Sequence, residues 1–229
     1  MRLVQAVREA LAEQADPVKA PGMQAYMKSA MPYRGVASPE QKLIFRTVLA
    51  DHPIDDRTAW AAAVRELWDE AAYREERYAA IALLGHRAYQ RWLDPATLPL
   101  VEHLLVSGAW WDYVDALATR TVGPLVRRDP AELVPVMHAW STGEDLWLRR
   151  TAIIHQVGAK ATTDRALLSA CIEPSLSRKE FFLRKAIGWA LRDLAWHDPD
   201  WVVAYVRSHA GELSGLSRRE ALKNVVTGE

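Results

Sequence analysis

The sequence predicts an all-α fold, a solenoid of stacked HEAT-like helix pairs, and three observations favour it. Apolar residues recur with the 3.6-residue period of an amphipathic helix along most of the 229-residue chain, and the alternation typical of strands is nearly absent. Proline directly follows Ser38, Asp94, Asp129 and Asp198, an arrangement that opens helices. No Gly/Ser-rich linker or low-complexity tract divides the chain. Tightly joined helices of similar length are expected to stack as successive pairs.

The expected helices follow in order along the chain. Residues 1–16, MRLVQAVREALAEQAD, form an amphipathic helix that contains acids and lacks the long apolar core and cleavage site of a signal peptide. The next clear start has Ser38 as N-cap, Pro39 at the first helical position and Glu40 in the first turn. Further helices begin at the Asp-Pro pairs and within 108–117, 143–154 and 178–196. We therefore expect about a dozen helices.

Residues 1–229 are predicted to form a single domain, because no segment marks a boundary. Successive helix pairs would build one concave surface, on which a long ligand could lie. The repeats have no clean internal period, so a helical bundle is the structural alternative.

Composition narrows the classes of function. Lys plus Arg equals Asp plus Glu at 29 each, which is unlike the basic excess of most nucleic-acid-binding proteins. The charge is uneven, however: residues 146–229 hold 13 basic against 9 acidic side chains, a net of +4, and residues 1–145 hold 16 against 20, a net of −4. The sequence contains no apolar run of about 18 residues, so it predicts no membrane span. The single cysteine, Cys171, is expected to be a buried small hydrophobe in a chain of the reducing cytoplasm.

The stretch GAWWDYVDAL, residues 108–117, carries the most informative pattern. Val114 and Leu117 mark the core side of this helix, with Trp111 and Asp115 four residues apart at its edge, where their side chains are neighbours. Trp110 points elsewhere and is expected to be structural. Asp115 lies too far in for a capping role and has no Lys or Arg four residues away, so we interpret it as an unpaired acid beside a tryptophan. Such a pair suits a flat cationic ligand and makes Asp115 a candidate electrostatic catalyst.

Basic and aromatic residues share a second stripe in residues 178–196. Leu183, Ile187, Ala190, Leu191 and Leu194 cover the core face, whereas Lys185, Trp189 and Arg192 follow i, i+4 and i+7 spacing on another face. Trp189 could simply pack into the core, but among cations it resembles a platform for a base or sugar beside phosphate-binding groups.

Residues 143–154, GEDLWLRRTAII, place Arg149 and Arg150 near the start of a further helix. Two adjacent arginines are not expected to both face the core, so at least one should be solvated, paired or bound to a ligand. A helix start also suits a phosphate. Arg178 and Lys179 are further candidates for contact with an anion, although exposed basic residues are more commonly only solvated.

The sequence motifs that mark metal sites and several common classes of enzyme are absent. The seven histidines show no H-x-x-x-H or H-E-x-x-H spacing and one cysteine cannot build a zinc cluster, so no metal is expected. Nucleophile-elbow, Walker and dinucleotide-binding motifs are absent.

Several stretches together resemble the AlkD-type DNA glycosylases of bacterial DNA alkylation repair. They are QAYMKSAMPYRGVASPEQK at 24–42, RELWDE at 65–70, WWDYVD at 110–115, DLWLRRTAII at 145–154, SRKEFFLRKAIGWALRD at 177–193 and LSRREALK at 216–223. The resemblance covers most of the chain. It implies a HEAT-like solenoid whose concave face binds duplex DNA, and excision of positively charged N3- and N7-alkylated purines without metal or cofactor.

The resemblance also implies roles for particular residues. Asp115 matches the catalytic aspartate of the family, Trp111 and Trp189 match its two lesion-flanking tryptophans, and Arg150 matches its site arginine, expected to hold a phosphate. Tyr26 matches a DNA-facing tyrosine, and Arg34 departs from the family pattern, where an apolar residue is usual. A monomer is expected, since one solenoid could wrap DNA without a second subunit. The expected location is the cytoplasm, where the protein would be associated with the nucleoid through DNA.

The chemistry implied by the resemblance suits these residues. Alkylation at N3 or N7 makes the purine cationic, so that it leaves as a neutral base while positive charge moves onto the deoxyribose. A fixed carboxylate would stabilise that cation and orient water. The family is thought to act without base flipping. Two alternatives remain open at this point: a non-catalytic relative that binds damaged DNA, and a helical-repeat scaffold for protein partners.

Overall fold

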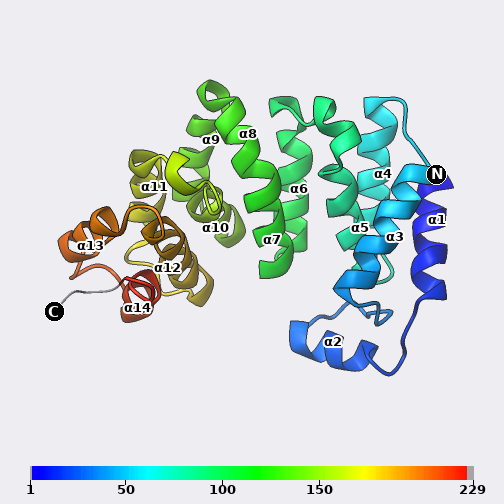
Figure 1. The fold of residues 1–229 in the computed structure, drawn as a ribbon, viewed down its shortest axis with the longest axis horizontal. Helices are drawn as coiled ribbons and strands as arrows, with labels where there is room; N and C mark the ends of the chain where they lie inside the picture. The colour runs from blue at the N-terminus through cyan, green and yellow to red at the C-terminus, as the bar shows by residue number, and fades with distance from the viewer. Residues whose placement is uncertain (1, 226–229) are drawn as a thin grey trace. The chain divides into compact units, whose positions relative to one another are not determined.

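The computed structural model describes residues 2–225, and its regular structure there is entirely helical, which confirms the all-α prediction (Figure 1). None of the helices within that range is long and apolar enough to cross a membrane. The chain packs as two compact units, divided between Leu93 and Asp94. The single domain expected over residues 1–229 stays a prediction, and each unit is described by itself below.

The first unit contains five α-helices and a 3₁₀ segment among its described residues. Helices α4 and α5 pack against each other, and α1 packs against α3. Trp60, Leu67 and Trp68 of α4 and Leu83 of α5 are fully buried and form much of the core. The elements are α1 (Arg2–Glu13), α2 (Ala20–Met27), α3 (Ser38–Asp51), α4 (Arg57–Asp69), α5 (Arg74–Leu84) and η1 (Arg87–Trp92).

The start of α3 differs from its prediction by one residue. Ala37 is the N-cap, Ser38 is already helical, and no side chain caps the helix. The fixed φ of Pro39 suits the first turn at either of its first two positions, so a proline near a helix start does not specify which residue is the cap.

A buried carboxylate organises the loop that leads into α3. Glu75 accepts hydrogen bonds from the backbone N–H groups of Arg34, Gly35 and Val36, at 3.0, 2.9 and 3.2 Å. Gly35 has φ of +86°, and a Cβ there would lie 2.0 Å from the carbonyl oxygen of Asp16, so only glycine fits. The loop turns Arg34, the departure from the family pattern, onto the ring of Tyr73, with 4.0 Å from guanidinium carbon to ring centroid.

The second unit contains the remaining helices. They are α6 (Leu98–Gly108), α7 (Trp111–Leu117), the π-helical turn η3 (Ala118–Val122), α8 (Gly123–Arg128), α9 (Pro130–Thr142), α10 (Leu146–Ile154), α11 (Arg165–Ile172), α12 (Phe181–Ala195), α13 (Pro199–Ser208) and α14 (Gly215–Ala221), with short 3₁₀ turns at Pro95–Thr97, Lys160–Thr162 and Glu173–Ser175. Asp94 and Asp198 act at helix starts as predicted: Asp94 forms a capping box with Thr97, and Asp198 accepts the N–H of Trp201. Asp129 precedes α9 without a side-chain capping hydrogen bond, and its carboxylate pairs with Arg128 instead.

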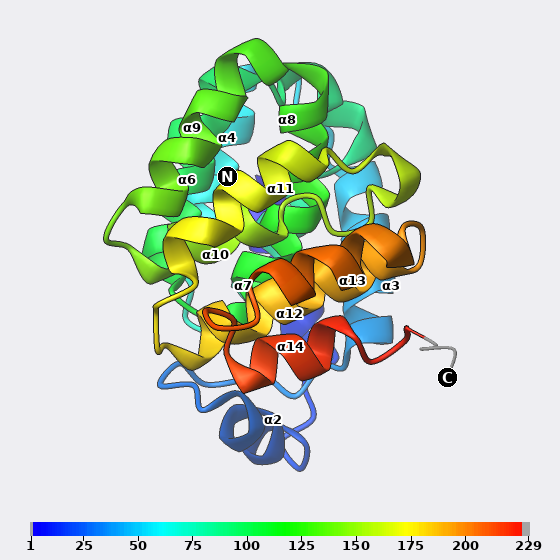
Figure 2. The ribbon, with the colours of Figure 1, turned by 90° about the vertical axis from the view of Figure 1, so that its left-hand side faces the viewer.

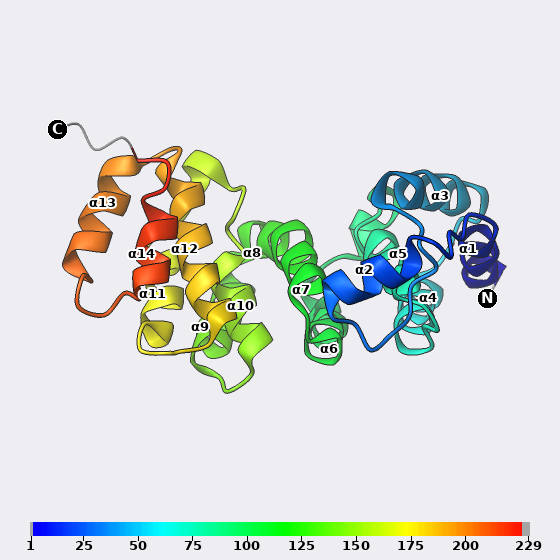
Figure 3. The same ribbon diagram turned by 90° about the horizontal axis from the view of Figure 1, so that it is seen from below.

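The helices of this unit stack in two layers. Helices α7, α10, α12 and α14 contact one another in that order, and α9 contacts α11 behind them. Figures 2 and 3 show α12 with α13 and α14 beside it. Because each pair contacts mainly the next, the unit is a helical-repeat solenoid, as predicted, and not a bundle around one central axis. The first layer, α7–α10–α12–α14, carries the candidate site.

The core of the second unit follows the predicted face of α12. Leu183, Ile187, Ala190, Leu191 and Leu194 are all buried, which confirms the stripe expected from the helical period. Cys171 is also fully buried, and burial raises the pKa of its thiol to about 12. The thiol therefore packs as a small hydrophobe, as expected.

A buried histidine makes stability depend on pH. Burial, aided by the positive charge of Arg127, lowers the pKa of His155 from 6.5 to about 4, and the Nδ1 atom lies 2.7 Å from the carbonyl oxygen of Ala152. As pH falls below 6.5, the unfolded chain takes up a proton that the folded protein excludes, so stability is lost between 6.5 and about 4. We expect this group to remove about 3 kcal/mol of the free energy of unfolding over that interval.

Urea unfolding at several pH values measures the free energy of unfolding and checks the predicted loss of stability at acidic pH. The variant His155→Asn keeps a donor near the position of Nδ1 but does not titrate, so its stability should fall less between pH 7 and 4 than that of the native protein. Parallel losses in the two proteins would contradict a role of His155 in the pH dependence.

Candidate active site

One pocket in the second unit collects most of the residues singled out from the sequence. It has a volume of about 360 Å³ and is built from α7, α10 and α12. Six of its lining residues were predicted from the sequence as site residues, and the other two are phenylalanines without such a prediction. The lining consists of Trp111, Asp115, Arg150, Phe181, Phe182, Lys185, Trp189 and Arg192.

Asp115 and Arg150 form a bidentate ion pair in the wall of this pocket. The Nε of Arg150 donates to Oδ1 of Asp115 at 2.7 Å and its Nη2 donates to Oδ2 at 2.8 Å. The side chains are 18% and 6% exposed, so the carboxylate faces the pocket more than the guanidinium does. The interpretation of Asp115 as an unpaired acid was wrong, because its partner comes from α10, 35 residues further along the chain.

Local structure fixes Arg150 in place. Asp145 caps α10 by accepting the N–H groups of Trp147 and Leu148 at 2.8 and 2.9 Å. The Nη1 of Arg150 donates to the carbonyl oxygen of Phe182 at 2.7 Å, which ties α10 to the start of α12. Each nitrogen of this guanidinium therefore has a protein acceptor, an arrangement that suits holding Asp115 better than holding a phosphate.

Arg149 has a structural environment. It is 6% exposed, and it donates to the carbonyl oxygens of Thr142 at 2.9 Å and Pro174 at 3.1 Å, as well as to that of Gly143. Both adjacent arginines are thus buried, contrary to the expectation that they would not both turn inward. Buried guanidinium groups are tolerated here because carbonyl oxygens and a carboxylate accept their hydrogen bonds.

The protonation of Asp115 reflects two opposing influences. Burial raises the pKa of its carboxyl above the ordinary value, and the hydrogen bonds and charge of Arg150 oppose that rise. The negative charge of Asp112 raises the pKa slightly further. The ion pair therefore favours the charged form of a carboxyl group whose burial favours the neutral form.

A π-helical turn begins three residues after Asp115, at the end of α7. The turn spans Ala118–Val122, and the hydroxyl of Thr119 donates to the carbonyl oxygen of Asp115 at 2.7 Å. At its end, a Cβ on Gly123 would lie 2.0 Å from the carbonyl oxygen of His155, so glycine permits the close approach of this helix to α10. This approach packs the start of α8 against the C-terminal end of α10, the helix that carries Arg150.

Aromatic rings form the rest of the wall. Phe182 packs against Trp147 and Trp110, with centroids 5.0 and 5.7 Å apart, so Trp110 is structural as expected. Phe181 is 55% exposed at the pocket. It lies four residues before Lys185 and extends the predicted Lys185–Trp189–Arg192 stripe by one turn, a signal that could have identified it.

The two cations of the α12 stripe share one partner. Glu220 of α14 contacts Nζ of Lys185 at 3.1 Å and also pairs with Nη1 of Arg192. Lys185 lowers the pKa of Glu220, so the carboxyl is more firmly ionised than an isolated glutamate. Lys185 and Arg192 line the pocket as predicted, yet a carboxylate already contacts both.

The remaining predicted residues lie outside the pocket lining. Arg178 pairs with Glu180 in the loop before α12, and Lys179 beside it is exposed. Tyr26 belongs to α2 of the first unit, where it is 78% exposed. Among residues 2–225, no group of three His, Cys, Asp or Glu side chains could hold a metal ion.

The pocket combines one negative charge with aromatic surfaces. A fixed carboxylate lies beside two half-buried tryptophans, Trp111 and Trp189, whose π faces attract cations. The pocket suits a flat group that carries or develops positive charge next to Asp115.

Comparison with known proteins gives a family and a related structure. The family model described as DNA alkylation repair enzyme matches residues 7–225. A solved structure of a predicted DNA alkylation repair enzyme from Enterococcus faecalis is similar over 94% of this chain and 98% of that one, with 29% sequence identity and a TM-score of 0.83. Comparison with the curated proteins gives no match.

Proposed function

Because the chain belongs to the DNA alkylation repair enzyme family, we propose that it is a DNA glycosylase for cationic N3- and N7-alkylpurines in duplex DNA. Family membership makes it an enzyme of alkylation repair. The observation that carries the finer proposal is the Asp115 carboxylate, held by Arg150 at 2.7 Å in a pocket that Trp111 and Trp189 also line.

The reaction is a hydrolysis at C1′ of the damaged nucleotide. The bond from C1′ to the purine nitrogen breaks, its electron pair goes to the cationic base, and the base leaves neutral. C1′ becomes an oxocarbenium centre, which water attacks with loss of a proton, leaving an abasic site. Asp115 stabilises the positive charge as it develops on the sugar and orients the water.

Five other pocket residues have a part in this proposal. Trp111 and Trp189 present π faces to the cationic nucleotide, and Arg150 is a positioning residue that keeps Asp115 charged and oriented. Lys185 and Arg192 contact DNA phosphates, with Arg178, Lys179 and Tyr26 as further contacts. Arg149 is left out of the interface because its guanidinium is engaged by carbonyl oxygens. No base-flipping step is required, since the catalytic groups act on the sugar.

Chromatographic detection of free base tests the proposal. The native protein is expected to release N7-methylguanine from a duplex and to leave an abasic site. Tight binding of the same duplex without release would contradict the proposal and favour a non-catalytic damage-binding role.

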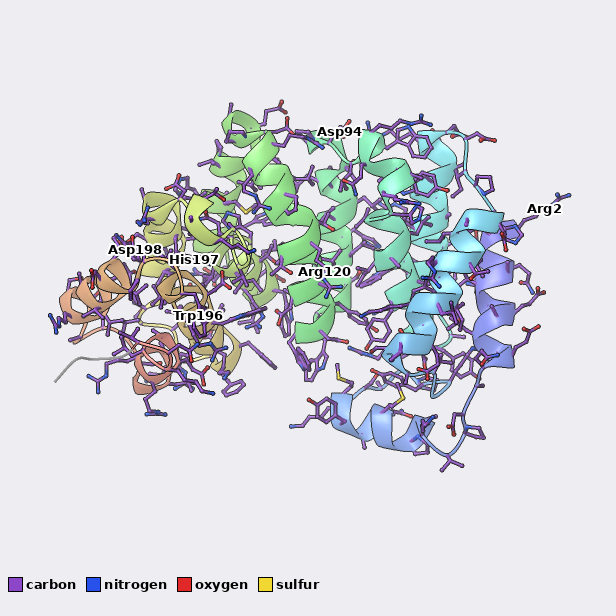
Figure 4. The ribbon with its side chains drawn as sticks, viewed as in Figure 1. Arg2, Asp94, Arg120, Trp196, His197 and Asp198 are labelled. Atoms are coloured by element: carbon purple, nitrogen blue, oxygen red, sulfur yellow. The ribbon has the colours of Figure 1, made fainter. Side chains whose placement is uncertain are left out.

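The tryptophans give a graded prediction. Trp111→Ala or Trp189→Ala should each slow base release by roughly 2- to 30-fold, the equivalent of about 0.5–2 kcal/mol of cation–π attraction. Trp196→Ala is the matched control, because Trp196, labelled in Figure 4, directly follows α12 and is 67% exposed. It does not belong to the pocket lining. Single-turnover rates on an N7-methylguanine duplex measure the effect. Equal rates for the Trp189 and Trp196 variants would contradict a role of Trp189 in catalysis.

A further inference from the structure

Glu220 is built into the wall behind the candidate site. It contacts Lys185 and Arg192, which lie one turn before and one turn after Gly188 on α12. A Cβ on Gly188 would lie 2.5 Å from Cβ of Glu220, so the absence of a side chain there allows α14 to approach closely. The side chain of Glu220 is 19% exposed. The ion pairs are therefore part of the packing of α14 on α12.

The charges around the pocket explain why this contact matters. Arg150, Lys185 and Arg192 supply three positive charges to the lining and Asp115 one negative charge, a net of +2. The proposed substrate is itself cationic and passes through a cationic sugar. Like charges in a partly desolvated pocket oppose both. The carboxylate of Glu220, in contact with two of the three cations, reduces the net charge to +1.

Lys185 and Arg192 are also the cations of the lining that a DNA phosphate could reach. A phosphate that approaches them must compete with Glu220, whose carboxylate is already paired with both. The affinity of the protein for any duplex, damaged or not, is then lower than the two cations alone would provide.

We propose that Glu220 is a specificity-determining residue, which weakens binding to ordinary DNA and keeps the pocket favourable for a nucleotide that becomes cationic. The inference rests on the proposed function. Glu220 acts through Lys185 and Arg192, so it is a positioning residue that need not touch the substrate.

The two halves of this role predict opposite effects of one substitution. Glu220→Gln keeps the size of the side chain and releases both cations. We expect about five- to tenfold tighter binding to an undamaged duplex at low salt. The slope of log K against log salt should steepen by about 0.9, one additional phosphate neutralised. The single-turnover rate of base release at saturating protein should fall by about three- to tenfold, because unscreened cations face the developing positive charge.

The experiment measures Kd for an undamaged duplex over a range of salt, and base release from an N7-methylguanine duplex, for four proteins. Glu220→Asp retains the charge and should behave like the native protein. Glu212→Gln removes the same charge from an exposed residue that makes no ion pair with Lys185 or Arg192. It should change neither quantity. Thermal unfolding of each variant shows whether α14 remains docked.

The combination of results separates the possible roles. Tighter binding together with slower release in Glu220→Gln alone supports the inference. A loss of both affinity and rate would assign Glu220 to the docking of α14 and overturn it, as would no change in either. Absence of base release by the native protein would instead overturn the proposed function, a failure recognisable before any Glu220 variant is compared.

Discussion

Asp115→Asn is expected to slow base release by about 10²–10³-fold while leaving duplex binding within a few fold of the native value. The substitution keeps the size of the side chain and its ability to accept a hydrogen bond from Arg150, but removes the charge that stabilises the oxocarbenium ion. Single-turnover release of N7-methylguanine measures the first quantity and titration of labelled duplex measures the second.

Asp112→Asn is the matched control for this prediction. Asp112 lies in the first turn of the same helix, α7, and is not part of the pocket lining. Its substitution removes an equal charge, and the rate should stay within a few fold. A rate for Asp115→Asn as high as that of the control would mean that the carboxylate is not the electrostatic catalyst.

Arg150→Met is expected to lower the rate of base release by about 10²-fold near neutral pH and to move the acid side of the pH–rate profile upward. Without its partner, Asp115 loses the fixed orientation that catalysis requires. Burial then raises the pKa of its carboxyl unopposed, so the carboxylate is protonated, and activity is lost, at a higher pH than in the native protein. Rates measured from acidic to mildly basic pH give both effects.

A variant of the adjacent Arg149 distinguishes an effect of Arg150 on the ionisation of Asp115 from a general loss of folding. Arg149→Met removes a second buried guanidinium, one bonded to backbone carbonyls, and should reduce thermal stability without moving the pH–rate profile. Arg150→Lys retains the charge and should restore part of the native profile. An unmoved acid limb in Arg150→Met would contradict a role of Arg150 in keeping Asp115 ionised.

Relations within one helix could be predicted from the sequence. The spacing of Trp111 and Asp115, and of Lys185, Trp189 and Arg192, follows from the helical period alone, and the pocket contains all five. The same period identified the buried face of α12, since both depend on which side chains share one face of a helix.

Relations between helices could not be predicted in this way. The partner of Asp115 comes from α10 and that of Lys185 and Arg192 from α14, and neither pairing is encoded in a local spacing. Arg149 was a candidate phosphate contact because its acceptors, the carbonyl oxygens of Thr142, Gly143 and Pro174, come close to it only when the chain folds. Tertiary packing supplies these partners, so contacts between different helices become visible only in the three-dimensional structure.

In the proposed mechanism, the pocket acts on a base because the base is cationic. The most direct test of this dependence on charge compares release of N7-methylguanine and of O6-methylguanine by the native protein from otherwise identical duplexes. The two bases carry the same methyl group on the same purine, but only the first is positively charged. We predict release of N7-methylguanine, faster than its spontaneous loss, and no release of O6-methylguanine. Equal release of both would contradict selection by charge, and release of neither, with both duplexes bound, would contradict catalysis.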